Sequence, residues 1–424
     1  MAAPSKNQKF DIILFAGGFG NDMFLYPMCE KQPKSLINVG NKPLIAYSLE
    51  YLEQHGFQKV FIVTNIAQSS EIKLKQYLEK DYKGNIQYEI INFPQNITEV
   101  EALISPELNQ KIKNDFILLN CDTITNLNLY DVMDVHSLQD SYITMVLKED
   151  QINQETEKII KPSSSNAHDI FFINDNNLAG KMVNMEVASE DKSLTIKKQI
   201  LTNLGSVQMY TNLFDTHIYI CKNSVLHLIK YMYNLNVDAE QFKEDVLPFL
   251  MDGQFNKELL KELNSYIEEN NRQVAFYLQE KLLQSLQIRT YIVQDLLVKR
   301  INNLKDYVQI NNEAPLQSGL FSSLQITENN GILQELSVLS YQGEGTEIGN
   351  NCTFRKSIIG KNVKIGENCK IENSIIMNGA QISDGCTIQN SIICQKVEIQ
   401  EKQKKIVSQI IEHKQNALIV EEIA

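Results

Sequence analysis

The chain has 424 residues and a net charge of −12, with 43% hydrophobic and 22% charged residues. This length exceeds one ordinary domain, and the composition is that of a folded globular protein rather than a disordered one. The acidic balance argues against nucleic acid as a direct partner, because phosphate binding needs clustered Lys and Arg, and no apolar run reaches the roughly 18 residues that a membrane span needs.

Two further features of the sequence indicate the cell compartment in which the protein works. The N-terminal stretch MAAPSKNQKF has no apolar segment of the kind that a secretory signal carries. The seven cysteines show no spacing of a disulfide framework, which suits a reducing compartment. We therefore expect a cytoplasmic protein with no membrane partner.

Apolar runs typical of buried strands alternate with helical patterns from residue 10 to about residue 150. The expected strands are 10–16, 59–64, 85–93 and 115–120, and the expected helices are 43–57, 70–82 and 98–112. This alternation predicts an α/β fold with a doubly wound, mostly parallel sheet. The β segments 168–174 and 216–222 extend the domain to residue 255, and 154–168 is expected to be a surface loop.

A second region, residues 256–330, combines helical spacing with dense charge, as in 257–270 and 293–304. We interpret it as a helical insertion or linker. The predicted domains are therefore 1–255, 256–330 and 331–424.

The C-terminal region carries an internal repeat. Large apolar residues recur in steps of six, five and six, so that each position returns after 17 residues. They are Ile348, Phe354, Ile359, Ile365, Ile371, Ile376, Ile382, Ile388, Ile393 and Ile399. Three apolar positions in each 17-residue turn predict a left-handed parallel β-helix of the hexapeptide type.

The cysteines of this region follow the same period. Cys352, Cys369 and Cys386 are 17 residues apart, and none belongs to a close Cys-x-x-Cys pair of the kind that binds zinc. We expect them to form a stacked column of small packing residues. Because residues 341–411 contain no histidine, we set aside the hexapeptide acyltransferases, which usually present one from the coils.

Three short motifs in the first domain follow one another in a recognisable order. They are AGGFG at 16–20, PKSL at 33–36 and LLNCD at 118–122. With the C-terminal repeat, they resemble the sugar-phosphate nucleotidyltransferases. In such a site the glycines let backbone N–H groups approach phosphates, a lysine and an arginine stabilise their charge, and a carboxylate holds Mg²⁺.

The resemblance assigns five residues to a relic nucleotide or sugar-phosphate pocket: Gly17, Gly18, Gly20, Lys34 and Asp122. The residues by themselves leave other interpretations open. The glycines suit a plain strand-to-helix turn, Lys34 suits a solvated position, and Asp122 suits a cap of the next segment.

The chain departs from the enzyme pattern at several positions. Asp22 stands where the enzymes have an arginine, and no arginine precedes Arg272. NITEVEA occupies 96–102, where the resemblance places a Gly-Thr-Ala segment beside the nucleobase, and the second metal carboxylate has no counterpart. We therefore expect no catalytic residue, no metal and no cofactor.

Longer stretches resemble the gamma-type subunits of eukaryotic translation initiation factor 2B, a branch of the same superfamily. They include 40–57, 116–136, 211–223, 244–255 and 354–378. The resemblance implies a non-catalytic scaffold or regulatory subunit that pairs with an epsilon subunit in a decamer with alpha, beta and delta subunits. Its client would be initiation factor 2, for which the complex is the guanine-nucleotide exchange factor, and the chain would lack the catalytic C-terminal helical domain of epsilon.

The superfamily also suggests an alternative function. The chain could be a nucleotide-sugar pyrophosphorylase of the GDP-mannose type, or the non-catalytic regulatory paralogue of one. The charge reversal at Asp22 argues against the active form, since loss of a cationic contact to phosphate costs several kcal/mol of transition-state stabilisation.

Overall fold

The computed structural model describes most of the chain, and its residues fall into two compact units. The described residues are 10–19, 25–30, 32–149, 169–174, 180–187, 201, 204, 206–235, 237–256, 258, 259, 261, 262, 265, 286–294, 296–313, 341–400, 405–407, 409–414 and 417–422. The first unit comprises 1–19, 50–65 and 84–298, and the second comprises 20–49, 66–83 and 299–424.

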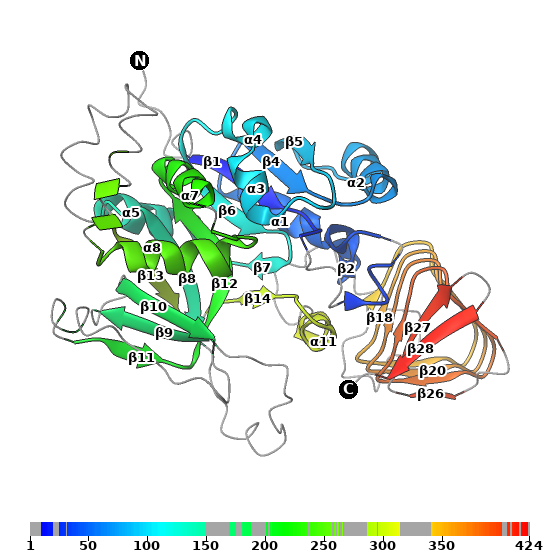
Figure 1. Cartoon of the computed structure of the whole chain (residues 1–424). Coiled ribbons are helices and arrows are strands. Elements are labelled where there is room, and N and C mark those ends of the chain that lie inside the picture. Colours follow the sequence, from blue (N-terminus) through cyan, green and yellow to red (C-terminus); the bar gives the residue numbers. More distant parts are fainter. Residues whose placement is uncertain are drawn as a thin grey trace. The chain divides into compact units, whose positions relative to one another are not determined.

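The described part of the first unit is built on a ten-stranded sheet, with the order β11-β9-β10-β13-β8-β12-β6-β1-β4-β5 (Figure 1). The strands are β1 (Phe10–Phe15), β4 (Lys59–Thr64), β5 (Gln87–Asn92), β6 (Asp115–Asn120), β8 (Ile143–Glu149), β9 (Asp169–Asn174), β10 (Lys181–Val187), β11 (Gln208–Tyr210), β12 (Leu213–Cys221) and β13 (Ile288–Val293).

Strand β1 organises the sheet, because it lies between β4 and β6 and is parallel to both. The chain moves outward from β1 through β4 to β5 and then returns to β6 on the other side of β1. β12 joins β6 and β8 in antiparallel fashion, and β13 is parallel to β8. The doubly wound sheet predicted from the sequence is therefore confirmed, with antiparallel strands added on the β12 side.

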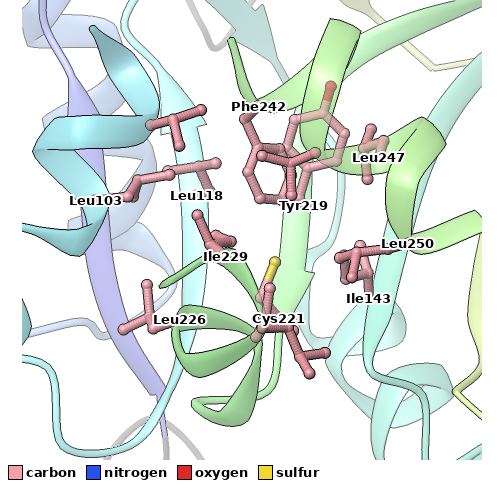
Figure 2. Packing of buried hydrophobic residues seen from close by; sticks show 14 of the residues in the cluster. Leu103, Leu118, Ile143, Tyr219, Cys221, Leu226, Ile229, Phe242, Leu247 and Leu250 are labelled. Carbon is pink, nitrogen blue, oxygen red and sulfur yellow. The ribbon is translucent and has the colours of Figure 1, made fainter. Parts of the chain in front are cut away.

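Helices cover one face of the sheet and enclose the main hydrophobic core. These elements are α3 (Glu99–Ile104), α4 (Pro106–Asn109), α7 (Ser224–Asn234), the π-helical turn η4 (Phe242–Val246) and α8 (Leu247–Gly253). Figure 2 shows Leu118, Tyr219 and Cys221 of the sheet packed against side chains from these helices, among them Leu226 and Leu250. The opposite face carries α5 (Leu129–Leu138) against β8, β12 and β13.

Two helix predictions need correction. The helix expected over 98–112 breaks into α3 and α4, because Pro106 has no N–H to continue the first helix and Ser105 caps the second. The helix expected over 293–304 is wrong, since residues 298–300 form β14 (Val298–Arg300) and α11 (Leu304–Glu313) begins at the end of that range.

The region interpreted as a linker also contributes β13 to the main sheet, where pairing with β8 and β10 overrides the helical pattern around it. The division of the chain at residues 255 and 330 stays a prediction. The predicted loop 154–168 lies outside the described residues, as does most of the expected helix 257–270.

The second unit begins with elements from early in the chain, and α11 (Leu304–Glu313) is bonded to the hairpin among them. They are the 3₁₀ turn η3 (Lys34–Leu36), the hairpin of β2 (Asn38–Val39) and β3 (Lys42–Pro43), the start of α1 (Leu44–Gln54), and α2 (Gln68–Lys80). Tyr307 and Asn311 of α11 are 0% and 1% exposed and bond the hairpin backbone: Tyr307 Oη donates to Asn38 O at 2.8 Å and Gly40 N donates to Asn311 Oδ1 at 3.0 Å. The side chain of Asn41, at the tip of this hairpin, donates to Ile359 O at 2.8 Å.

The described residues from 341 onward form the predicted β-helix, whose short parallel strands stack on three sheets with an offset of 17 residues, or of 18 in the last parallel pairing of two of the sheets (Figure 1). The strands are β15 (Tyr341–Gln342), β16 (Glu347–Ile348), β17 (Thr353–Arg355), β18 (Ile358–Ile359), β19 (Lys364–Ile365), β20 (Lys370–Glu372), β21 (Ile375–Ile376), β22 (Gln381–Ile382), β23 (Thr387–Gln389), β24 (Ile392–Ile393), β25 (Glu398–Ile399), β26 (Lys405–Val407), β27 (Gln409–Lys414) and β28 (Ala417–Glu422). The antiparallel pair β27–β28 closes one of these sheets.

Columns of small residues hold successive coils at a constant spacing. Cys369 and Cys386 are 1% and 0% exposed, and Cys352 Sγ contacts Gly366 O of the next coil at 3.0 Å. The buried serines 357, 374 and 391 form a second column, in which the N–H of each later serine donates to the hydroxyl of the one before at 3.2–3.3 Å. The stacked cysteine column predicted from the sequence is therefore confirmed.

One buried histidine couples the stability of the first unit to pH. His136 on α5 is 2% exposed, and its Nδ1 lies 2.9 Å from Thr144 Oγ1 on β8. Burial, aided by the nearby Lys222 ammonium and opposed by Asp140, lowers the pKa of His136 to about 4. The folded protein therefore holds this imidazole neutral.

We expect the stability of the first unit to fall as the pH drops from 6.5 toward 4. The pKa of His136 in the folded state lies below its ordinary value of 6.5, so the stabilising neutral form dominates above pH 6.5 and is lost in this window. The shift corresponds to a loss of about 3 kcal/mol in the free energy of unfolding. Denaturant unfolding at several pH values would show a flatter profile for His136→Gln. Thr144→Val should keep the slope of the native protein, and a similar flattening in this control would contradict the assignment.

Candidate functional site at the carboxyl ends of β1 and β6

The turn after β1 has an unusual backbone conformation. Gly17, Gly18 and Phe19 have successive positive φ angles of 106°, 83° and 56°. Two of these positions are glycines that the resemblance assigned to the pocket, and the third holds a phenylalanine in the left-handed region, which costs conformational energy for a residue with a Cβ. The Phe19 ring packs edge-on against Phe15, with ring centroids 5.2 Å apart.

Asn65, the residue that follows β4, holds this turn in place. Its Oδ1 accepts the backbone N–H of Phe19 at 2.6 Å, and its Nδ2 donates to Ile97 O at 2.9 Å. A Cβ added to Gly18 would lie 1.7 Å from Asn65 Oδ1, so only glycine fits beside this side chain. Gly18 of the motif is therefore required by its contact with Asn65 inside the protein.

The segment that the resemblance places at the nucleobase has a local structural role. Thr98 and Glu101 form a capping box at the start of α3, with Glu101 N donating to Thr98 Oγ1 at 3.1 Å and Thr98 N donating to Glu101 Oε2 at 3.0 Å. These side chains satisfy the first N–H groups of the helix. The NITEVEA stretch therefore starts α3.

The glycine turn and Asp122 lie at the same edge of the sheet. β1 and β6 are parallel with Phe15 opposite Asn120, and Cys121 N donates to Phe15 O at 2.8 Å just beyond the strand ends. Asp122 is 3% exposed. The chain adds β4 and β5 on one side of β1 and then β6 on the other, so β1 and β6 flank the topological switch point of the sheet. Ligands bind at such a switch point in open α/β sheets.

Lys34 and Gly20 complete the set of residues in the predicted pocket. Lys34 belongs to the second compact unit, where it is 2% exposed and its Nζ donates to Asn302 Oδ1 at 3.4 Å. The alternative interpretation of Lys34 as a solvated residue is therefore wrong, because its side chain is buried and contacts Asn302 in the segment before α11. Gly20 and Asp22 lie outside the described residues.

A polar network on β12, which the sequence reasoning did not identify, lies at the end of β6. Asp215 accepts the Tyr219 hydroxyl and, at 2.9 Å, the N–H of His217. The His217 Nδ1 lies 3.4 Å from Asn120 Nδ2, and the backbone of His217 is left-handed, with a φ of 55°. The only signal in the sequence was FDTH, a charged residue inside an otherwise apolar strand pattern.

The carboxyl group of Asp215 is almost completely buried. Desolvation raises the pKa of Asp215. The positive charge of Lys243 and the hydrogen bonds that the carboxylate accepts from Tyr219 and His217 oppose this rise. Lys243 Nζ also lies 2.6 Å from Asp169 Oδ2 in a mostly buried ion pair. Lys243 thus connects η4 to Asp169 at the start of β9 and interacts with the charge of Asp215 on β12. Asp215 lies where the pairing of β12 with β8 shifts register.

The resemblance implies that the carboxylate of Asp122 would hold Mg²⁺. Proteins usually bind Mg²⁺ through one or two carboxylates together with substrate phosphates and waters, and the buried carboxylate of Asp122 just after β6 suits the first of these roles. Among the described residues, no group of three or more His, Cys, Asp and Glu side chains is placed to hold a metal ion. Asp122 would therefore hold the ion only together with a bound phosphate.

Comparison with known proteins gives two family models and several similar chains. Residues 11–157 match the nucleotidyl transferase family, and residues 322–415 match the model described as the EIF2B subunit epsilon LbH domain. The chain is 30% identical over 396 residues to translation initiation factor eIF2B subunit gamma of Dictyostelium discoideum, which covers 83% of this chain and 88% of that relative. The chain belongs to the family of eIF2B gamma subunits.

Two more relatives agree with this assignment. The eIF2B gamma subunit of Schizosaccharomyces pombe is 25% identical over 315 residues, covering 72% of this chain and 65% of the relative. The eIF2B epsilon subunit of Dictyostelium discoideum is 27% identical over 230 residues, covering 52% of this chain and 30% of that longer relative. The two parts of the predicted fold, nucleotidyltransferase-like and left-handed β-helical, are thus both confirmed.

In the portion of the chain that the structure describes, no helix combines the length with the hydropathy needed to cross a membrane.

Replacing Gly18 tests whether the turn after β1 is a structural requirement. Gly18→Ala places a Cβ against Asn65 at a φ of 83°, so we expect the free energy of unfolding to fall by about 2 kcal/mol or more. Gly253→Ala is the matched control, because a Cβ there meets its nearest neighbours at 3.4–3.5 Å, an ordinary contact. Equal effects of the two substitutions in denaturant unfolding would contradict the argument.

Proposed function

We propose that this gamma-family chain is a non-catalytic scaffold and regulatory subunit of the translation initiation factor eIF2B complex. In this proposal it pairs with an epsilon subunit, assembles with alpha, beta and delta subunits in a cytoplasmic decamer, and acts on initiation factor 2 as client. The complex exchanges guanine nucleotide, the epsilon subunit carries that exchange, and this chain promotes it.

The observation that carries the non-catalytic assignment is the internal use of the phosphate-binding groups. The Phe19 N–H, at the place where a backbone donor would meet a phosphate, is bonded to Asn65 Oδ1 at 2.6 Å. Lys34, the predicted phosphate lysine, is buried against Asn302. A transferase needs such donors aimed at the charge that develops on the phosphates.

The charge pattern supports the same proposal. Asp22 places a negative charge in the loop where the enzymes have an arginine, and the first arginine of the chain is Arg272. A carboxylate near a phosphate repels it, whereas an arginine would bind it in bidentate fashion. We therefore propose that Gly17, Gly18, Gly20, Lys34 and Asp122 are the relic of a nucleotide or sugar-phosphate pocket, kept for folding and assembly.

The architecture suits a scaffold. We propose that the nucleotidyltransferase-like domain 1–255 and the β-helix 331–424 both offer surfaces to protein partners, joined by 256–330. A β-helix is a rigid stack whose coils repeat the same contacts, so its outward side chains vary without affecting the core. The net charge of −12 favours protein rather than nucleic acid as the direct partner.

One alternative function has an observation in its favour. The match of residues 11–157 to the nucleotidyl transferase family fits a pyrophosphorylase of the GDP-mannose type, or its regulatory paralogue. The active form requires that the loop amide and Lys34 leave their present partners. The two functions are separated by the following experiments.

Assembly is tested by affinity purification of the tagged chain from its source cell. We expect the other eIF2B subunits to co-elute, with epsilon as the most abundant partner, as identified by mass spectrometry. Ile376→Asp, which buries a charge in a β-helix position that is 0% exposed, should reduce this recovery, whereas the exposed Lys364→Ala should not. Recovery without any eIF2B subunit would overturn the assembly proposal.

Catalysis is tested with the purified chain, GTP, mannose 1-phosphate and Mg²⁺. We expect no release of pyrophosphate above the rate of a protein-free control, because the phosphate-binding donors are engaged inside the fold. Sustained pyrophosphate release that depends on the chain would refute the non-catalytic assignment and favour the pyrophosphorylase.

A further inference from the structure

Asn65 connects three segments that meet at the carboxyl edge of the sheet. It follows β4 directly, its Oδ1 accepts from Phe19 N in the turn after β1, and its Nδ2 donates to Ile97 O in the connection from β5 to α3. The side chain is 6% exposed. One carboxamide therefore uses both its acceptor and its donor to bond two connections that are 78 residues apart in sequence.

We propose that Asn65 is a clasp that competes with anionic ligands for the backbone of the turn after β1. Its Oδ1 occupies the position at the Phe19 N–H where a phosphate oxygen would be received. Its Nδ2 bond to Ile97 O links the same side chain to the connection from β5 to α3. Asn65 would thereby hold the turn in its present conformation without a bound anion.

Geometry and packing both favour the state in which Asn65 is bonded to the turn after β1. The Phe19 N–H to Asn65 Oδ1 distance of 2.6 Å is at the short end of N–H···O bonds, and Gly18 leaves room for this close approach. Phe19 and Ile97 are themselves partly buried and pack against the main hydrophobic core. Opening the turn would therefore expose apolar surface as well as two backbone groups.

The clasp is separable from the ordinary polar contacts of the same sheet edge. The neighbouring pair, Thr64 Oγ1 and Asn92 Oδ1, is bonded at 2.8 Å between the ends of β4 and β5. This contact joins two adjacent strands and does not include the turn. Asn92→Ala is accordingly a matched control for loss of an asparagine at this edge.

Hydrogen–deuterium exchange of the full chain, read at residue level by electron-transfer fragmentation, tests the contact. In Asn65→Ala we expect the Phe19 amide to exchange about tenfold faster, the factor that corresponds to the usual net contribution of one hydrogen bond. Peptides covering 93–98 should also exchange faster. Asn65→Asp keeps the acceptor and loses the donor, so it should protect Phe19 and loosen only 93–98.

The competition itself is tested by calorimetric titration with inorganic pyrophosphate. Asn65→Ala should bind pyrophosphate about tenfold more tightly than the native chain, whereas Asn92→Ala should behave as the native chain does.

Three results would overturn the proposal. The first is unchanged exchange of the Phe19 amide in Asn65→Ala, and the second is the same effects in Asn92→Ala. The third is equal pyrophosphate affinity of Asn65→Ala and the native chain, or no binding by either. Asn65→Asp keeps the exchange test decisive should Asn65→Ala fail to fold. These readouts use the chain by itself, so they stand or fall independently of the partners recovered in the assembly experiment.

Discussion

The parallel pairing of β1 with β4 on one side and β6 on the other is the constraint on which the first unit depends. A strand buried on both faces and both edges must have its N–H and C=O groups bonded along its whole length. This requirement brings the end of β6 beside the end of β1, where Cys121 N bonds Phe15 O. Gly17, Gly18 and Asp122 meet there as a consequence of sheet topology, whether or not a ligand binds.

Beyond the strand ends, the backbone groups must find other partners, either within the protein or in a ligand. In a nucleotidyltransferase the ligand would satisfy the donors of the turn after β1. Here the protein satisfies the Phe19 N–H with Asn65, and the buried Lys34 ammonium with Asn302. An internal bond carries no translational entropy cost, so it competes strongly with a dissolved anion. The chain belongs to the family of eIF2B gamma subunits, and in its structure these two polar groups are bonded within the protein.

The second unit obeys a different rule, since each coil of the β-helix contacts mainly its neighbours. The register repeats every 17 residues, and the buried columns of cysteine and serine keep the coils evenly spaced. The unit also includes the hairpin of β2 and β3, which α11 fixes through Tyr307 and Asn311 and which contacts Ile359 through Asn41. A segment from early in the chain is thereby built into the same compact unit as the β-helix.

The sequence by itself determined what depends on local pattern. Continuous apolar runs identified β4 and β6 at their observed bounds, and the 17-residue period identified the β-helix and its column of cysteines. The resemblance and the absence of arginine before Arg272 suggest a degraded phosphate site, which stays a prediction. These features are readable because each rests on residues close together in the chain or repeated at a fixed interval.

Tertiary structure alone decided the partners of the polar groups. No local signal shows that Asn65 reaches both Phe19 and Ile97, that Lys34 is buried beside Asn302, or that the β12 network forms around Asp215. The strand β13 escaped prediction for the same reason, because its state is set by β8 and β10 rather than by its own pattern. Burial leaves each polar group to be satisfied by whichever residue the fold places beside it, and those residues are distant in sequence.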